Sequence, residues 1–257
     1  MWDPQTYLTY ADERTRPARD LLAAVDVAEP RRVVDLGCGT GTSTRLLKTR
    51  WPAAEVIGYD SSPEMIAAAR EAGDAITYEV ADATTWRPSG PVDVLFSNAL
   101  LQWVPGHLGL LPLWLAGVPP AGRLAFQVPG NFDAPHQTLL RELCESTAWR
   151  DRLGHISNRR EHVHTPAEYA DALAAAGARP DVWETTYLHR LTGPDPVLTW
   201  TSGTALRPVL AALDGDRAAR EAFLAEYGEM VRTAYPVGQD GTTAFPFRRI
   251  FAVAAPH

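Results

Sequence analysis

The chain has 257 residues, of which 46% are hydrophobic and 21% charged, and this length suits one α/β domain over residues 1–257 with a single large core. It contains no apolar run of about eighteen residues, and its N-terminus lacks the basic-then-apolar layout of a signal peptide, so we expect a soluble, cytoplasmic protein. A formal net charge of −7, without a run of Lys and Arg, argues against nucleic-acid binding and against attachment to a membrane surface.

The first part of the chain predicts alternating strands and helices. Valine-rich apolar runs at 32–36 and 55–59 indicate buried strands, and the segment between them has helical spacing at Leu46, Leu47 and Trp51. A second helix is expected from Ser62, as N-cap, and Pro63 to about Gly73. Further elements are strands at 76–80, 92–97 and 123–128 and a helix at 107–115. Such alternation predicts a doubly wound, mostly parallel sheet.

The second part changes rhythm and predicts two lid-like insertions, at about 129–165 and 194–244. Residues 137–149 have a helical pattern, and residues 150–164 are polar. Thr165 and Pro166 open a capped helix that Gly177 ends. Residues 182–191 alternate as a strand, 194–235 are helical, and the apolar run 245–254 is expected to return to the sheet as a strand.

A glycine loop follows the first strand and precedes a helix, where a bound nucleotide would lie. The dinucleotide pattern GxGxxG, counted from Gly37 and Gly39, requires glycine at position 42, but Thr42 stands there and the third glycine is Gly41. Asp35 precedes the first glycine by two residues. A pyrophosphate calls for backbone donors, whereas S-adenosylmethionine carries an ammonium group that a carboxylate can hold. We therefore predict that Asp35 contributes to binding S-adenosylmethionine rather than a dinucleotide.

Polar side chains also follow the next three strands. Asp60 ends the second strand, where its two oxygens can accept both ribose hydroxyls. Asp82 follows the third and can accept the adenine amino group, and Asn98 ends the fourth, facing the methyl group. Because ligands lie outside the carboxyl ends of parallel strands, these residues are expected to line one site.

The chain resembles the class I methyltransferases, and more narrowly the trans-aconitate 2-methyltransferases. The likeness runs nearly end to end, and it is most specific in Trp183–His189 (WETTYLH) and in the terminal motif FPFRR at 245–249. It also covers WDP at 2–4, RxRP at 14–17, the loop 35–41, the segment Asp60–Met65 and NALLQW at 98–103. The polar segment 150–161 matches no part of the family pattern.

The resemblance implies a Rossmann-like class I methyltransferase fold: a mostly parallel seven-stranded sheet with an antiparallel last strand, plus a helical lid. It implies S-adenosylmethionine as cofactor and a small carboxylic acid, trans-aconitate, as methyl acceptor. The predicted cofactor site comprises Asp35, Gly37, Cys38, Gly39, Asp60, Ser61, Met65, Asp82, Ala83, Asn98 and Trp103. The predicted acceptor site comprises Tyr7, Arg14, Arg16, His189 and Arg248.

The reaction sets the chemistry expected at the acceptor site. A carboxyl group with a pKa of roughly 4 is ionised at neutral pH, so no general base is expected. Positioning and exclusion of water would supply catalysis, with arginines holding the remaining carboxylates. Successive strand residues face opposite sides, so only one of Arg248 and Arg249 can enter the pocket.

Three other functions remain open at this point. The acceptor can be a natural-product acid, hydroxyl or amine, of which the last two usually need a base. The sheet can bind NAD, against which Thr42 argues, or the protein can be a regulator that binds S-adenosylmethionine without turnover. With only Cys38 and Cys144 as cysteines, no disulfide framework is expected, and a metal site at His162 and His164 is not expected either.

Overall fold

The computed structural model describes residues 11–156 and 163–257, and side chains from Thr15 onward. In chain order its helices, 3-10 turns (η) and strands are α2 (Ala11–Ala24), β1 (Arg32–Leu36), α3 (Thr42–Arg50), β2 (Glu55–Asp60), α4 (Pro63–Arg70), β3 (Thr77–Val80), β4 (Val94–Asn98), η1 (Leu101–Trp103), η2 (His107–Leu110), α5 (Leu111–Leu115), β5 (Arg123–Pro129), α6 (Pro135–Glu145), α7 (Arg150–Leu153), η3 (Gly154–Ile156), α8 (Pro166–Ala175), β6 (Ala178–Leu191), α9 (Pro196–Ser202), α10 (Arg207–Ala212), α11 (Arg217–Ala234) and β7 (Thr243–Pro256).

Seven strands of the described chain form one sheet in the order β3-β2-β1-β4-β5-β7-β6. The pairs from β3 to β5 are parallel, and β7 pairs antiparallel with β5. The predicted sheet, mostly parallel with an antiparallel last strand, is therefore confirmed. The order reverses between β1 and β4, and this switch point places the carboxyl ends of β1, β2, β3 and β4 along one edge, where open α/β sheets bind ligands.

The chain divides into two compact units, which we name the sheet unit and the helical unit. In the described residues the sheet unit comprises 14–130, 163–185 and 249–257, and the helical unit comprises 11–13, 131–156 and 186–248. Most of the predicted insertion ranges belong to the helical unit. Across the described chain, no helix combines the length and apolar character that crossing a bilayer requires.

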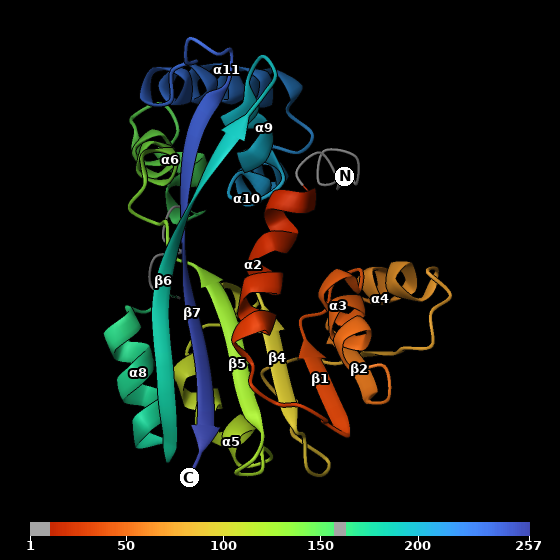
Figure 1. Ribbon diagram of the computed structural model, residues 1–257. Helices are drawn as coiled ribbons and strands as arrows, with labels where there is room; N and C mark the ends of the chain where they lie inside the picture. The colour runs from red at the N-terminus through yellow and green to blue at the C-terminus, as the bar shows by residue number, and fades with distance from the viewer. Residues whose placement is uncertain (1–10, 157–162) are drawn as a thin grey trace. The chain divides into compact units, whose positions relative to one another are not determined.

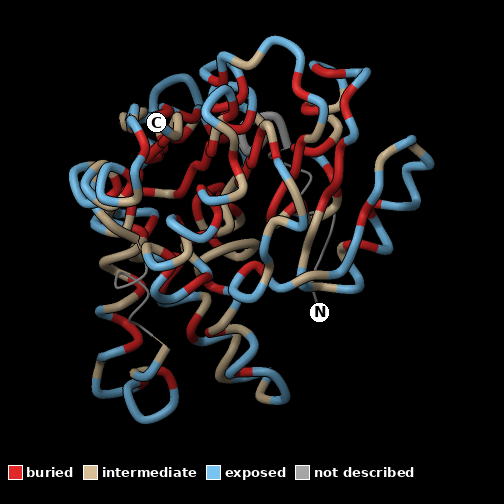
Figure 2. Tube along the Cα trace, turned by 90° about the horizontal axis from the view of Figure 1, so that it is seen from below, coloured by how far each residue is buried: buried red, intermediate tan, exposed pale blue. Residues whose placement is uncertain are grey.

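The sheet unit is built around a core between the sheet and two helices, α5 and α8. The largest buried side chains in this core include Trp114 of α5, Tyr169 of α8 and Phe126 of β5. Figure 1 shows α5 behind the sheet and α2 in front of it. Figure 2 shows long buried stretches of chain between exposed loops. Strands β1, β4 and β5 are buried along most of their length, whereas β3 and β6 are mostly exposed or half-buried. Both faces of the central strands are thus covered, which explains why β1, β4 and β5 read as continuous apolar runs.

The helical unit has a hydrophobic core of its own, formed by α6, α7, α9, α10, α11 and the adjoining parts of β6 and β7. Aromatic side chains dominate it: Trp200, Phe223, Tyr227 and Phe245 are each almost fully buried. Within it His136 is also buried, and Nδ1 of its ring lies 2.9 Å from the Tyr235 hydroxyl. Burial lowers the pKa of His136 to about 3, so this imidazole is neutral at physiological pH.

Several predicted elements differ from the observed ones. The expected helix at 107–115 is a 3-10 turn followed by the short helix α5. The expected helix at 137–149 ends at Glu145, and α7 starts separately at Arg150. Strand β6 begins at Ala178, four residues earlier than expected, and helix α2 was not predicted.

Candidate active site

The glycine loop joins β1 to α3 with three glycines in the left-handed region. The φ angles of Gly37, Gly39 and Gly41 are 75°, 55° and 82°. A Cβ at Gly41 would also lie 2.5 Å from the Tyr78 hydroxyl, and a Cβ at Gly37 would lie 2.8 Å from Cβ of Leu100. Glycine is therefore required here both by the backbone and by close packing.

The N–H groups of the first three loop residues donate within the protein. Gly37 and Cys38 both donate to the carbonyl of Tyr59, at 2.8 and 2.9 Å, and Gly39 donates to Oδ2 of Asp60 at 2.9 Å. A pyrophosphate loop presents these groups to its ligand instead. The loop thus lacks the donor arrangement of a dinucleotide site, which agrees with the spacing argument from Thr42.

Asp35 lies in the interior beside this loop, with no exposed surface. Its Oδ2 accepts hydrogen bonds from the hydroxyls of Ser43 and Thr44, each at 2.7 Å, while Oδ1 has no hydrogen-bond partner in the described chain. Burial, together with the nearby Asp60 carboxylate, raises the pKa of Asp35 to about 6, so the group is ionised at neutral pH.

Asp60 ends β2 and connects the loop to α4. Its Oδ2 accepts from Gly39 and its Oδ1 from the N–H of Ser62 at 2.9 Å, and the side chain remains partly exposed. Each carboxylate oxygen has a second lone pair, so both can still accept ribose hydroxyls. Ser62 caps α4 by accepting from the N–H of Met65, as the sequence predicted. Asp35 and Asp60 together make this part of the site negative, which suits a cation and opposes a pyrophosphate.

Three further predicted cofactor residues, Cys38, Ser61 and Met65, lie close to Asp35 or Asp60 in the sequence. The Cys38 side chain is buried with Ile66 and Tyr78, so it can reach a ligand only through its backbone. Ser61 is exposed and Met65 is partly exposed.

Asp82 follows β3 and is exposed. Its Oδ1 accepts from both the N–H and the hydroxyl of Thr84, at 2.8 and 2.7 Å, and these bonds lower the pKa of Asp82. This arrangement is a turn stabilised by its own side chain. Its neighbour Ala83 is buried in the core of the sheet unit.

Asn98 ends β4, as predicted, and leads into a strained turn. Its Oδ1 accepts from Nε2 of Gln127 at 2.9 Å. The next residue, Ala99, has a φ of 57°, a conformation that is uncommon outside glycine and that often marks functional turns. Trp103, in η1, keeps 47% of its surface exposed, which leaves an apolar face for a ligand ring.

Gln127, which was not among the predicted site residues, also lies at this edge, beside Arg249, which the sequence offered as the alternative to Arg248. Nη1 of Arg249 donates to Oε1 of Gln127 at 2.9 Å, so Arg249, Gln127 and Asn98 form a continuous chain. A signal for Gln127 was present, because a polar residue interrupts the apolar run of β5. Arg248 is exposed and Arg249 is buried, so the expected alternation is confirmed.

Of the remaining predicted acceptor residues, Arg16 and His189 have described side chains. Tyr7 and the side chain of Arg14 lie outside the described residues. Arg16 is exposed and faces Asp20 with 3.8 Å between Nε and Oδ2. His189 is buried in the helical unit, where its ring stacks on Trp200 with centroids 5.0 Å apart.

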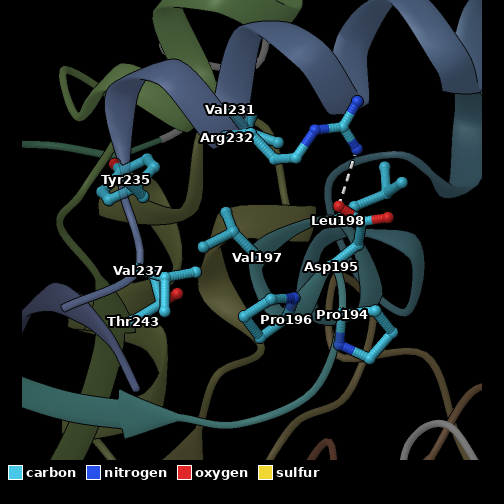
Figure 3. A pocket seen from close by; sticks show the side chains of 10 residues that line it. All are labelled: Pro194, Asp195, Pro196, Val197, Leu198, Val231, Arg232, Tyr235, Val237 and Thr243. Atoms are coloured by element: carbon cyan, nitrogen blue, oxygen red, sulfur yellow. Dashed lines mark hydrogen bonds and ion pairs between the residues drawn. The ribbon is translucent and has the colours of Figure 1, made fainter. Parts of the chain in front are cut away.

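A cavity of about 100 Å³ lies within the helical unit (Figure 3). Arg232 donates to carboxylate oxygens of Asp195 and Glu229, each at 2.7 Å, so it is already neutralised. The cavity therefore does not suit a polyanion. Its lining residues are Pro194, Asp195, Pro196, Val197, Leu198, Val231, Arg232, Tyr235, Val237 and Thr243.

In the described chain, no group of three or more His, Cys, Asp or Glu side chains is placed to hold a metal ion.

Comparisons with known proteins identify the family of this chain. Residues 33–110 match a family model described as a methyltransferase domain. The sequence is 54% identical to a trans-aconitate 2-methyltransferase of Streptomyces avermitilis, covering 98% of this chain and 96% of the relative. It is 51% identical to one of Mycolicibacterium gilvum, covering 99% and 98%.

Solved structures show the same fold at low sequence identity. A putative sarcosine dimethylglycine methyltransferase from Galdieria sulphuraria has a TM-score of 0.57 at 14% identity, covering 100% of this chain and 92% of that one. A Haemonchus contortus phosphoethanolamine N-methyltransferase, solved with S-adenosyl-L-methionine, has a TM-score of 0.57 at 17% identity, covering 94% and 53%. The chain thus belongs to the trans-aconitate 2-methyltransferase family of S-adenosylmethionine-dependent class I methyltransferases.

Proposed function

We propose that this enzyme methylates one carboxylate of trans-aconitate and releases the monomethyl ester and S-adenosylhomocysteine. The observation that carries the proposal is the identity of 50–54% over nearly the whole chain with several relatives of that name. S-adenosylmethionine supplies the methyl group when bound. The bond between the methyl carbon and sulfur breaks as a carboxylate oxygen of the acceptor forms the ester bond to that carbon.

The protein's own residues would bind and orient the reactants. Asp60 would accept the ribose hydroxyls, and the charge of Asp35 would favour the ammonium group. Asp82 and Trp103 would contact the adenine, and Asn98 would lie nearest the methyl group. Since the acceptor carboxylate is already ionised, these residues need only hold the reactants in line and exclude water.

The acceptor would be a small free acid, and the enzyme would work in the cytoplasm. A protein of net charge −7 is unsuited to nucleic acid or anionic lipid. Cys38 and Cys144 are both free thiols, as expected in a reducing compartment.

A panel of acids tests the proposed activity. Purified enzyme is incubated with S-adenosylmethionine and trans-aconitate, a dicarboxylic acid or a monocarboxylic acid, and both S-adenosylhomocysteine and the methyl ester are quantified. We expect the highest kcat/KM with trans-aconitate. Turnover of a hydroxyl or amine acceptor in preference to every acid would contradict the proposal.

Asp60→Asn tests the cofactor site. Loss of one charge-assisted acceptor should weaken S-adenosylhomocysteine binding by about 10- to 100-fold in calorimetric titration. Glu55→Gln is the matched control, because Glu55 is an exposed carboxylate at the opposite end of the same strand. Equal affinities of the two variants would contradict the assignment, as would NAD binding by the wild type.

A further inference from the structure

A tyrosine of the edge strand β3, Tyr78, packs against the glycine loop. Tyr78 pairs in register with Gly58 of β2, and Gly58 pairs with Asp35 of β1. Residues paired in this way face the same side of a sheet. Because Gly58 has no side chain, the Tyr78 ring fills that space, and a Cβ at Gly58 would lie 2.9 Å from Cδ1 of Tyr78. The ring is buried beside Cys38 of the loop, with a relative exposure of 3%.

The far end of the same ring meets Gly41, the residue that precedes α3. A Cβ at Gly41 would lie 2.5 Å from the hydroxyl oxygen and 2.9 Å from Cζ of Tyr78. A Cβ at Gly39, by contrast, would meet no atom of the described chain within 4 Å. The two glycines therefore have different roles. Gly39 leaves the backbone open to a ligand, whereas Gly41 gives room to the tyrosine.

A chain of polar contacts also connects the tyrosine hydroxyl to the loop backbone. The hydroxyl donates to Oδ2 of Asp74 at 3.3 Å, and Nη1 of Arg45 lies 3.7 Å from the same oxygen. Nη2 of Arg45 donates to the carbonyl of Thr40, within the loop, at 3.1 Å. Burial, together with the Asp74 carboxylate, raises the pKa of Tyr78 to about 12, so the hydroxyl keeps its proton at neutral pH.

Resting on the proposed function, we propose that Tyr78 is a positioning residue for S-adenosylmethionine. Its ring supports Gly41, and its hydroxyl acts through the polar chain on the Thr40 carbonyl. The loop held in this way also carries the Gly39 N–H, which donates to Oδ2 of Asp60 at 2.9 Å. Displacement of the loop would therefore move the donor that orients the carboxylate expected to bind the ribose. Since Tyr78 is buried, it acts on the cofactor through the loop.

Two substitutions of the tyrosine test this inference. Tyr78→Leu removes the ring, and Tyr78→Phe removes only the hydroxyl. We expect S-adenosylhomocysteine to bind about 10- to 100-fold more weakly to the leucine variant and about 3- to 10-fold more weakly to the phenylalanine variant. Tyr169→Phe is the matched control, because it removes another buried hydroxyl of the sheet unit, which lies 2.9 Å from Nε2 of His107. Its affinity should equal that of the wild type.

Steady-state kinetics distinguish positioning from a general loss of structure. The loop binds the cofactor alike in the ground state and the transition state, so KM for S-adenosylmethionine should rise in both variants. We expect kcat and KM for trans-aconitate to stay within about twofold of the wild type. A rise confined to kcat or to KM for the acceptor would overturn the inference.

Calorimetry on the folded variants, checked by urea denaturation, completes the test. Wild-type affinity in Tyr78→Leu, or an equal loss in Tyr169→Phe, would overturn the inference. If Tyr78→Leu does not fold, Tyr78→Phe and Arg45→Ala carry the test, since each breaks the polar chain to Thr40, and wild-type affinity in both would overturn it. Turnover of trans-aconitate by the wild type upholds the proposed function in each of these cases. A wild type that does not bind S-adenosylhomocysteine would overturn both.

Discussion

Asp35 accepts hydrogen bonds that hold the start of α3, but burying its negative charge destabilises the folded protein. Ser43 and Thr44 hold one of its oxygens at the start of α3, but full burial raises its pKa from 3.8 to about 6. The folded protein therefore binds more protons than the unfolded chain between these two values. It follows that the free energy of unfolding falls as pH rises from about 4 to about 6, and that this loss persists at neutral pH.

Asp35→Asn should separate stability from cofactor binding. The amide can still accept from both hydroxyls but carries no buried charge, so stability at pH 7 should be unchanged or higher by up to about 3 kcal/mol. Affinity for S-adenosylhomocysteine should fall about tenfold or more. Urea denaturation and calorimetry measure the two quantities. A large loss of stability would mean that Asp35 serves only to hold α3.

The same group predicts a pH dependence of cofactor affinity. An ammonium group favours ionised Asp35, so affinity should be full above about pH 6 and should fall by up to about tenfold for each pH unit below it. Calorimetric titrations of S-adenosylhomocysteine from pH 5 to pH 7.5 measure this change. Asp35→Asn should remove it, and a wild-type affinity that does not vary with pH would contradict the assignment.

Among the helices and strands, those with local signals were predicted best. Ser62 with Pro63 and Thr165 with Pro166 each start a helix where expected, because an N-cap hydroxyl and a first-turn proline act through the nearest backbone groups. Helix α2 was missed although Ala18, Leu21, Leu22 and Val25 are spaced as one buried face, and Pro17 lies inside it. Tertiary packing stabilises this helix despite the proline.

In the candidate site too, the features set by neighbouring residues could be predicted and those set by tertiary contacts could not. Asp60 and Asn98 could be placed from sequence because each directly follows an apolar run. The prediction placed Arg248 in the acceptor site, but which of Arg248 and Arg249 is buried depends on the register of β7 against β5, which adjacent residues do not encode. The contact between Gln127 and Arg249 joins residues 122 positions apart, so it too required the fold.

The capping box of α8 gives a prediction for a single element. Thr165 accepts from the N–H of Glu168 at 3.3 Å, and Glu168 accepts from the N–H of Thr165 at 2.7 Å. Thr165→Ala should lower the free energy of unfolding by about 1 kcal/mol, measured from the urea midpoint. Thr233→Ala, at an exposed threonine within α11, should change it by less than about 0.5 kcal/mol. Equal effects in the two variants would show that the box does not stabilise α8.

At the scale of the whole molecule, the described residues bury their apolar side chains in more than one hydrophobic cluster. The sheet unit and the helical unit each bury an aromatic-rich cluster, around Trp114 and Trp200 respectively. Composition sets how much apolar surface a chain can bury but not how many cores share it. The predicted cofactor side chains belong to the sheet unit, whereas His189 and Arg248 belong to the helical unit.

This division predicts where ligands slow amide exchange. Binding to the folded state stabilises the segments that form the site, so S-adenosylhomocysteine should slow hydrogen–deuterium exchange in the sheet unit, at residues 35–44, 58–65, 81–86 and 97–104. NAD is the control and should not protect these residues. Protection by S-adenosylhomocysteine centred on α9, α10 and α11 would place the cofactor in the helical unit and contradict the site described for the glycine loop.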